Sequence, residues 1–356
     1  MSRSPKQPIL YQNELKIPEK YLRFATPAII ASYRAEKLKC EKLVEIGAGI
    51  GGQTFAFAKT CKKILAFESN KENAGILIKN LKKLQIKNVE VVIADALSRI
   101  SVEKIKKFQP DIIFCDSERP EKAERTIENI KPSLKDILGI FSNITKKIAI
   151  EIPPFTNDIE KIKIGYDFEE EFISINHQLN RLTLYFNDLK KSEVSAISLP
   201  SKEKIEKKDF ASTKKFPTGR EGGINERNIK DKYFYVIDPT IIIANLLAEL
   251  SRKFDSPVIF LDKPVLLSNK KIESNFLTGY KIEKICKNNK KEILQELKKI
   301  GAGKIILRYN VNPEDYWKVR NFYENQLQGN KEISLFIDDK NNEAILCEKF
   351  KSALSD

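Results

Sequence analysis

Between Glu36 and Phe155, short apolar runs alternate with segments whose apolar residues lie three or four positions apart. The apolar runs are LVEIG, KILAFE, VEVVIAD, DIIFCD and KIAIEI, and the helical patterns are QTFAFAKTC, ENAGILIKNLKKLQI, SRISVEKIKKF and LKDILGIFSNI. Strands that alternate with helices predict a parallel, doubly wound sheet. The nearly continuous apolar character of the runs is typical of strands that are buried on both faces.

A different pattern follows the fifth strand. The stretch EEFISINHQLNRLTLYF contains two β-rich runs separated by NHQLN, which predicts an antiparallel hairpin. His177 falls in this turn, and we expect it on the surface. We therefore predict an α/β, Rossmann-like domain over residues 41–189, with a mostly parallel sheet of seven strands that ends in the hairpin.

The rest of the chain has two parts. Residues 190–232 are mostly polar and basic, which predicts a short strand around VSAISL and then a mobile connector. From residue 233 to 350, helical and strand patterns predict a smaller α+β domain with a ferredoxin-like arrangement. Asp238 followed by Pro239 is a typical helix start in this part.

Four glycines fall within six positions, directly after the first predicted strand. The segment is Glu45-Ile-Gly47-Ala-Gly49-Ile-Gly51-Gly52, at the edge where an open α/β sheet binds ligands. Glycine lets a ligand lie against bare backbone. The spacing is not that of a phosphate-binding loop, and an acid beside the loop favours a cationic or zwitterionic ligand.

Further acids end the next three strands, and we expect them around the same pocket. Glu68 follows the second strand, where a carboxylate can accept both hydroxyls of a ribose. Asp95 follows the third strand and can reach the amino group of a purine, and Asp116 ends the fourth. Each acid taken alone is equally consistent with a solvated charge at a strand end.

With the glycine motif, Glu68 and Asp95 in this order, the chain resembles the class I S-adenosylmethionine-dependent methyltransferases. The resemblance implies S-adenosylmethionine as the cofactor. It also implies that Glu45 contacts the methionine amino group and that Glu68 binds the ribose. The other implied contacts are those of the glycine loop and of the adenine, made by Gly47, Gly49, Gly51, Asp95 and Ala96.

A second resemblance involves RFATPAIIASYRAEKL, which precedes the first strand. This segment and GGQTFAFA are similar to segments of prokaryotic methyltransferases with a THUMP-like C-terminal domain, and to trimethylguanosine synthase. The resemblance implies that residues 1–40 form a helical segment that closes over the cofactor, with Phe24 and Thr26 near it. It also implies a THUMP-like domain over residues 233–350. An ordinary N-terminal helix starting at Thr26-Pro27 is the alternative.

The acceptor of the methyl group is expected beside the end of the fourth strand. Asp116 is the candidate that orients the acceptor or takes its proton. Arg119 and Arg125 are candidates for holding a phosphate of the substrate, or else form salt bridges with nearby glutamates. The sequence here departs from the motifs of enzymes that methylate exocyclic base nitrogens, so the methylated atom is not predicted. The prolines of EIPPF are expected to end the fifth strand.

Charge and cysteine usage limit the partners. A net charge of +14 favours an anionic partner, with nucleic acid first, although a lysine-rich solvated surface also explains it. The five cysteines are scattered without a Cys-x-x-Cys pair, so we expect no structural metal. No apolar stretch is long enough to span a membrane and no signal peptide is evident, so we expect a cytoplasmic protein.

These observations together predict an RNA methyltransferase that acts on tRNA or rRNA, with the C-terminal domain docking the RNA. Lysines opposite the apolar stripe of KNNKKEILQELKKIGAGK support RNA binding. A methyltransferase for proteins or small molecules, and a non-catalytic RNA-binding scaffold that keeps the pocket, remain as alternatives. The oligomeric state is not predicted.

Overall fold

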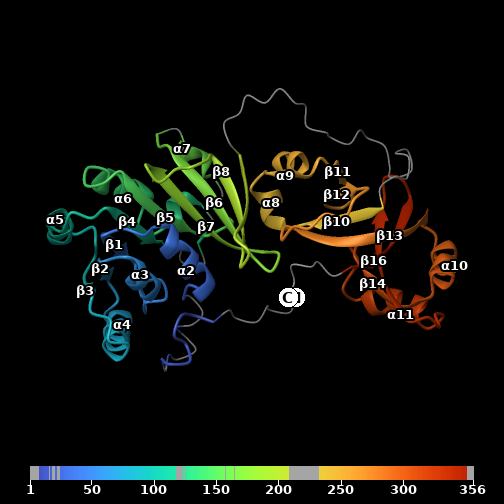
Figure 1. The fold of residues 1–356 in the computed structure, drawn as a ribbon, viewed down its shortest axis with the longest axis horizontal. Coiled ribbons are helices and arrows are strands. Elements are labelled where there is room, and N and C mark those ends of the chain that lie inside the picture. Colours follow the sequence, from blue (N-terminus) through green and yellow to red (C-terminus); the bar gives the residue numbers. More distant parts are fainter. Residues whose placement is uncertain are drawn as a thin grey trace. The chain divides into compact units, whose positions relative to one another are not determined.

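The computed structural model describes residues 8–15, 17, 21, 25–117, 123, 124, 126–156, 158–163, 165–207 and 232–350. The described residues form two compact units (Figure 1). The first unit contains the residues up to Lys202 together with Glu206 and Lys207. The second contains Glu203–Ile205 and residues 232–350.

The first unit is built on a nine-stranded sheet in the order β3-β2-β1-β4-β5-β7-β6-β8-β9. Strands β1 to β5 are parallel, as their alternation with helices predicted. Strand β7 is antiparallel to both β5 and β6, which confirms the predicted hairpin. The bounds are β1 (Lys42–Ile46), β2 (Lys63–Glu68), β3 (Val89–Ile93), β4 (Ile112–Asp116), β5 (Lys147–Ile152), β6 (Phe168–Ile175), β7 (Gln178–Asn187), β8 (Val194–Leu199) and β9 (Glu203–Lys207).

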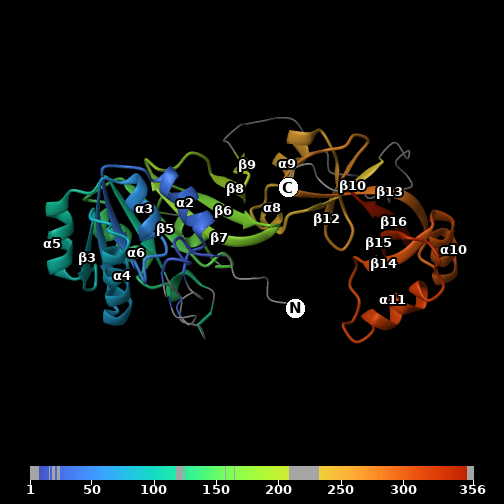
Figure 2. The same cartoon turned by 60° about the horizontal axis from the view of Figure 1, so that its bottom comes forward.

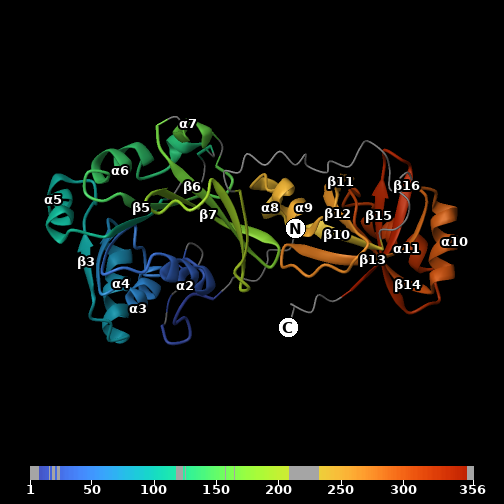
Figure 3. The same ribbon diagram turned by 45° about the horizontal axis from the view of Figure 1, so that its top comes forward.

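Helices cover both faces of this sheet. Figure 3 shows α6 and α7 on one side and α2, α3 and α4 on the other. Side chains of α2 and α3 enter the main core. There the ring of Phe57 in α3 meets the ring of Phe114 in β4 edge to face. The bounds are α2 (Ala28–Lys37), α3 (Thr54–Thr60), α4 (Lys71–Lys83), α5 (Arg99–Phe108), η1 (Ile127–Asn129), α6 (Leu134–Phe141) and α7 (Glu160–Lys163).

The prediction of seven strands is wrong, because two strands follow the hairpin. Residues 190–207, assigned from sequence to the basic connector, carry β8, which is the short strand predicted around VSAISL, and β9, which was not predicted. Strand β8 pairs in parallel with β6, so β6 does not form an exposed sheet edge. Ile197 and Leu199 of β8 are also buried against Ile30 of α2. Residues 208–231 of the expected connector lie outside the described part of the chain.

The second unit is α+β, as predicted, and has a seven-stranded sheet in the order β11-β12-β10-β13-β16-β15-β14. Its strands are β10 (Tyr233–Ile237), β11 (Val258–Phe260), β12 (Pro264–Ser268), β13 (Leu277–Lys287), β14 (Ala302–Leu307), β15 (Lys331–Asp338) and β16 (Glu343–Lys349). Its helices are α8 (Pro239–Ile243), α9 (Leu247–Phe254), α10 (Lys290–Ile300) and α11 (Tyr316–Glu324). Figure 2 shows α10 and α11 beside the strands β14 to β16.

This topology differs from the ferredoxin-like arrangement that the sequence suggested. From β13 onward the elements run β-α-β-α-β-β, whereas a ferredoxin-like unit runs β-α-β-β-α-β. The predicted helix start is confirmed, because the Asp238 carboxylate accepts from the Thr240 amide at 2.8 Å and caps α8. Gly301 ends α10 in the left-handed conformation. Local capping does not fix how strands pair, so the sheet order is not contained in these signals.

Candidate active site

A cavity of about 360 Å³ opens at the carboxyl end of β1. It is lined by Glu45 and by five residues of the glycine loop, three of them glycines, by the segment before α2, and by Asp116 at the end of β4. Among the residues predicted for the site, the cavity therefore brings together Thr26, Glu45, Gly47, Gly49 and Asp116. The other lining residues are Tyr21, Ala25, Ala48, Ile50, Gly52, Gln53 and Asn73.

The glycine loop lies too close to its neighbours for side chains. A Cβ on Gly47, whose φ is +78°, would lie 2.6 Å from the Asp116 carbonyl oxygen. A Cβ on Gly52 would lie 2.9 Å from the Thr26 amide nitrogen. The loop is thus packed backbone to backbone against the end of β4 and against the segment that leads into α2.

Gly49 and Gly51 differ from each other. Gly49 has a φ of +56°, and a Cβ there would meet nothing within 4 Å, so the loop exposes bare backbone to the cavity at this point. Gly51 has a φ of +102° and does not line the cavity. A Cβ on Gly51 would lie 2.6 Å from atoms of Leu77 and Phe55, so this glycine serves the packing of α3 and α4.

Glu45 is buried beneath the loop, and one oxygen of its carboxylate is unsatisfied. Its side chain is 1% exposed, and its Oε2 makes no hydrogen bond within the described residues. Burial raises the pKa of Glu45 to about 8, because the charged form is poorly solvated there. A buried acceptor without a donor is costly, and a cationic ligand group in the cavity would satisfy it.

Glu68 holds the glycine loop rather than lining the cavity. Its Oε2 accepts from the Gly49 amide at 2.7 Å, and its Oε1 accepts from the Asn70 amide at 2.7 Å. Asn70 in turn caps α4. Glu68 therefore links the loop to the start of α4, and it retains further lone pairs for a ligand.

Asp95 and Ala96 lie beyond the lining of this cavity. Asp95 is exposed and its Oδ1 accepts from the Leu97 amide at 2.9 Å, whereas Ala96 is buried. Glu45 of β1 and Asp116 of β4 therefore both line the cavity, whereas Asp95 does not. Phe24, Arg119 and Arg125, which were also predicted for the site, lie outside the described residues.

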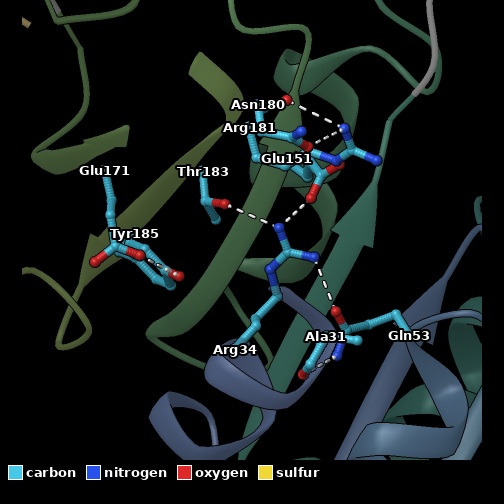
Figure 4. A network of polar contacts seen from close by, with 9 residues as sticks. All are labelled: Ala31, Arg34, Gln53, Glu151, Glu171, Asn180, Arg181, Thr183 and Tyr185. Atoms are coloured by element: carbon cyan, nitrogen blue, oxygen red, sulfur yellow. Dashed lines mark hydrogen bonds and ion pairs between the residues drawn. The ribbon is translucent and has the colours of Figure 1, made fainter. Parts of the chain in front are cut away.

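A buried arginine that sequence reasoning missed joins α2 to the site (Figure 4). Arg34 is fully buried, and its guanidinium donates to Glu151 at the end of β5 and to Gln53 Oε1 at 2.9 Å. Gln53 also lines the cavity and donates to the Ala31 carbonyl at 3.1 Å. A third bond reaches Thr183 Oγ1 on β7 at 3.3 Å. One side chain thus ties α2 to β5, to β7 and to the residue that precedes α3.

Arg34 keeps its charge in this setting. Burial is the largest single effect and disfavours the charged guanidinium, but Glu151 together with Tyr185 and Asp116 outweighs it and raises the pKa of Arg34. Glu151 also pairs with Arg181, whose Nε lies 2.7 Å from its Oε1. An arginine in a helical pattern gives no sequence signal of burial, which is why this pair escaped prediction.

A second buried carboxylate anchors α2 from another side. Glu171 of β6 is fully buried and accepts from the Tyr33 hydroxyl at 2.9 Å, from the Lys37 ammonium at 2.5 Å and from the Tyr185 hydroxyl at 3.0 Å. Tyr33 and Lys37 belong to α2, whereas Tyr185 belongs to β7. The segment that follows Thr26 is therefore held in place by two buried carboxylates.

Within the described residues, no group of three or more His, Cys, Asp or Glu side chains is arranged to hold a metal ion. Cys61 and Cys115 are buried, and His177 is exposed, as predicted, in the turn between β6 and β7. No described helix is both long and apolar enough to cross a membrane.

Replacing Arg34 by methionine should lower the free energy of unfolding by about 3 kcal/mol, because Glu151 then loses its buried partner. Arg181→Met is the matched control, since it removes a partly exposed partner of the same carboxylate and should cost about 1 kcal/mol or less. Urea unfolding of both variants measures the difference. Equal losses would contradict the role assigned to Arg34.

Replacing Glu45 by glutamine should change how stability depends on pH. Between its unfolded pKa of about 4.3 and its folded pKa of about 8, wild-type Glu45 holds a proton only in the folded state, so stability falls as pH rises. The unfolding free energy of Glu45→Gln minus that of the wild type should therefore rise by about 1.4 kcal/mol per pH unit across this range.

Glu314→Gln, at an exposed position of the second unit, is the control for this titration. The unfolding free energy of Glu314→Gln minus that of the wild type should stay nearly constant from pH 5 to pH 8. A flat profile for Glu45→Gln as well would show that Glu45 ionises normally in the folded protein.

The known proteins that this chain is similar to are methyltransferases by name. Residues 40–120 match a family model described as RNA cap guanine-N2 methyltransferase. A stretch of 65 residues, 18% of this chain, is 37% identical to the probable cobalt-precorrin-6B C(15)-methyltransferase (decarboxylating) of Methanococcus vannielii. A stretch of 57 residues, 16% of this chain, is 39% identical to the ribosomal RNA small subunit methyltransferase A of Desulforapulum autotrophicum. The matches span 36% and 20% of those two proteins.

A crystal structure of a presumed methyltransferase from Porphyromonas gingivalis W83 shares the fold, with a TM-score of 0.72 at 17% identity. The likeness covers 94% of this chain and 83% of that one. The family match lies over the glycine loop, the Glu68 carboxylate and the acid that ends β4. The chain therefore shares the fold of this methyltransferase structure, and residues 40–120 of its first unit are similar to a methyltransferase family.

Proposed function

We propose that the whole chain is an S-adenosylmethionine-dependent methyltransferase that modifies RNA, with tRNA or rRNA as the substrate. The observation that carries the proposal is the cavity of bare glycine backbone above a buried, unsatisfied Glu45 carboxylate. A zwitterionic nucleoside fits this combination, because its ammonium group satisfies Glu45 and its body lies against Gly49. When bound, S-adenosylmethionine supplies an electrophilic methyl group.

The residues predicted for the cofactor are each assigned a part in holding it, whether or not they line the cavity. Glu45 binds the amino group, and Gly47, Gly49 and Gly51 shape the loop. Glu68, already fixed by two backbone amides, offers its remaining lone pairs to the ribose hydroxyls. The adenine is assigned to Asp95 and Ala96, with Phe24 and Thr26 covering the cofactor from the segment before α2.

Asp116 is proposed to orient the acceptor and to take its proton. Its side chain lines the cavity next to the loop, and it lies at the end of β4, opposite Glu151 in the register of β4 and β5. A base must lie within hydrogen-bonding reach of the group it deprotonates, and Asp116 lines the cavity that is proposed to hold the cofactor. Arg119 and Arg125 are proposed to hold a phosphate of the RNA.

The finer family resemblance is also part of the proposal. The close approach of Gly52 to Thr26 and the two buried anchors of α2 support a segment that closes over the cofactor, as in the THUMP-like group and in trimethylguanosine synthase. The family model described as RNA cap guanine-N2 methyltransferase matches next to that segment. We extend the same proposal to a THUMP-like role of the second unit.

The proposal that RNA is the substrate rests on the net charge of the chain and on the names of its relatives. The chain carries a net charge of +14, and two matched relatives are ribosomal RNA methyltransferases by name. On α10, Ile293 and Leu297 face the core, which leaves Lys291 and Lys298 exposed on the other side of the helix. Such a basic face tracks phosphates without reading sequence.

A small-molecule methyltransferase is the second candidate, and one specific observation favours it. The relative from Methanococcus vannielii is named for a cobalt-precorrin, which is not an RNA. The glycine loop and Glu45 serve either acceptor, so the first unit does not discriminate between them. The second unit does, because an enzyme for a small acceptor does not need it for turnover. A protein acceptor and a non-catalytic scaffold are the remaining alternatives.

Transfer of labelled methyl from S-adenosylmethionine into RNA that lacks its native modifications tests this proposal. The wild type should label RNA and not protein. Asp116→Asn should lower the rate by about 100-fold or more, the usual contribution of a positioned base, while binding of S-adenosylhomocysteine stays unchanged. Asp339→Asn, an exposed acid in the turn between β15 and β16, is the control and should match the wild type. Labelling of protein or of a tetrapyrrole instead would contradict the proposal.

A further inference from the structure

The sheet of the second unit is rolled so that its two edges meet. The turn between β11 and β12 belongs to one edge, and the segment after β14 belongs to the other. The Asn310 amide donates to the Asp262 carboxylate at 3.3 Å and joins these edges. A cavity of about 450 Å³, within the usual range of ligand pockets, lies on the face of the sheet bounded by this closure.

The floor of the cavity is apolar and aromatic with two hydroxyls. Val236, Thr278 and Tyr280 lie on the same face of neighbouring strands, and the Tyr280 and Phe336 rings meet at 5.2 Å with an interplanar angle of 80°. The Thr278 and Tyr280 hydroxyls make no hydrogen bond with the described residues. A flat ring system with polar edges therefore finds both apolar contact and hydrogen-bonding groups on this floor.

The rim of the cavity carries an excess of positive charge. Lys263, Arg308 and Lys349 line it, all three exposed, and none of them has an ion pair within 4.0 Å among the described residues. Asp262, the acid that lines the cavity, already accepts from the Asn310 amide. Nearby lysines differ, since Lys281 pairs with Glu283 at 2.8 Å and Lys304 pairs with Glu332 at 2.5 Å.

The Arg308 charge acts directly on the floor. Arg308 and Tyr280 line the same cavity, and the Arg308 charge opposes the rise that burial causes in the pKa of Tyr280. Arg308 follows β14 and is held by its backbone, whose amide donates to the Leu335 carbonyl at 2.9 Å. A guanidinium with free donors beside an aromatic floor suits a phosphate joined to a planar base.

We propose that this cavity binds one nucleotide of a single-stranded RNA segment, with the base on the Tyr280–Phe336 floor and the phosphate between Arg308, Lys263 and Lys349. The inference rests on the proposed function, because it assigns a subsite for the RNA that the methyltransferase domain modifies. Stacking together with phosphate contacts is the usual way in which proteins hold single strands. Three positive side chains at the rim favour a strand over an isolated nucleotide, because a strand carries further phosphates next to the one in the cavity.

Binding of a fluorescein-labelled decauridylate to the full-length protein tests the proposal. Arg308→Gln should weaken binding by about 10- to 100-fold, the usual loss for a hydrogen bond to a charged group. The plot of log K against log salt concentration has a negative slope. Lys349→Gln should make this slope shallower by about 0.7, the value for one phosphate contact on a single strand. Lys340→Gln, an exposed lysine that does not line the cavity, is the charge-matched control and should do neither.

Tyr280→Phe keeps the ring and removes the hydroxyl, so it should weaken binding less than Arg308→Gln and keep the melting temperature near that of the wild type. Loss of binding by Lys340→Gln equal to that by Arg308→Gln would overturn the proposal. So would tighter binding of uridine monophosphate than of the decamer, or binding of poly-glutamate that shows the same dependence on Arg308.

The outcome is separable from that of the proposed function. A wild type that methylates RNA, with Arg308→Gln equal to Lys340→Gln in decamer binding and in RNA methylation, overturns the cavity assignment alone. A wild type that binds the decamer through Arg308 but labels no RNA supports the cavity and contradicts the proposed function.

Discussion

Close packing of backbone against backbone at the glycine loop is the constraint on which the first unit depends. The loop leaves no room for a Cβ at Gly47 beside the Asp116 carbonyl, or at Gly52 beside the Thr26 amide. These two contacts bring three segments to one point: the end of β1, the end of β4 and the start of α2. Because Gly47 and Gly52 are packed against these segments, Gly49 is the glycine whose backbone stays open to the cavity.

The acids at the strand ends have separate tasks, although they look equivalent in the sequence. Glu45 is buried without a partner for Oε2, Glu68 is used by two backbone amides, and Glu151 is neutralised by Arg34. Burial alone is unfavourable for all three carboxylates. The structure compensates two of them from within, so Glu45 is the one whose compensation awaits a ligand.

Prediction from sequence succeeded where a signal is local or periodic. The five parallel strands, the hairpin around His177 and the helix cap at Asp238 follow from the spacing of apolar residues and from the residue types at turns and helix starts. It failed where pairing is long-range. Strand β8 pairs in parallel with β6 although all of β7 lies between them in the sequence, and the sheet of the second unit has an order that no local pattern encodes.

The same distinction holds for the site. The glycine spacing located the cavity and Glu45, because both depend on residues that are adjacent in sequence. The ring of four acids did not emerge, since Asp95 is exposed and Glu68 binds the loop instead. Arg34 and Gln53 were missed because their partners, Glu151 and Thr183, are distant along the chain and meet only in the folded sheet.

Calorimetric titration of S-adenosylhomocysteine into the wild type, Gly49→Ala and Gly301→Ala tests the central claim most directly. Both glycines have a positive φ and nothing within 4 Å of a Cβ, so both variants should lose a similar roughly 1–2 kcal/mol of stability. The account predicts that the wild type and Gly301→Ala bind one equivalent, and that Gly49→Ala binds about tenfold more weakly or worse, because its methyl group occupies the open backbone. Equal binding by all three proteins, or binding by none, would contradict it.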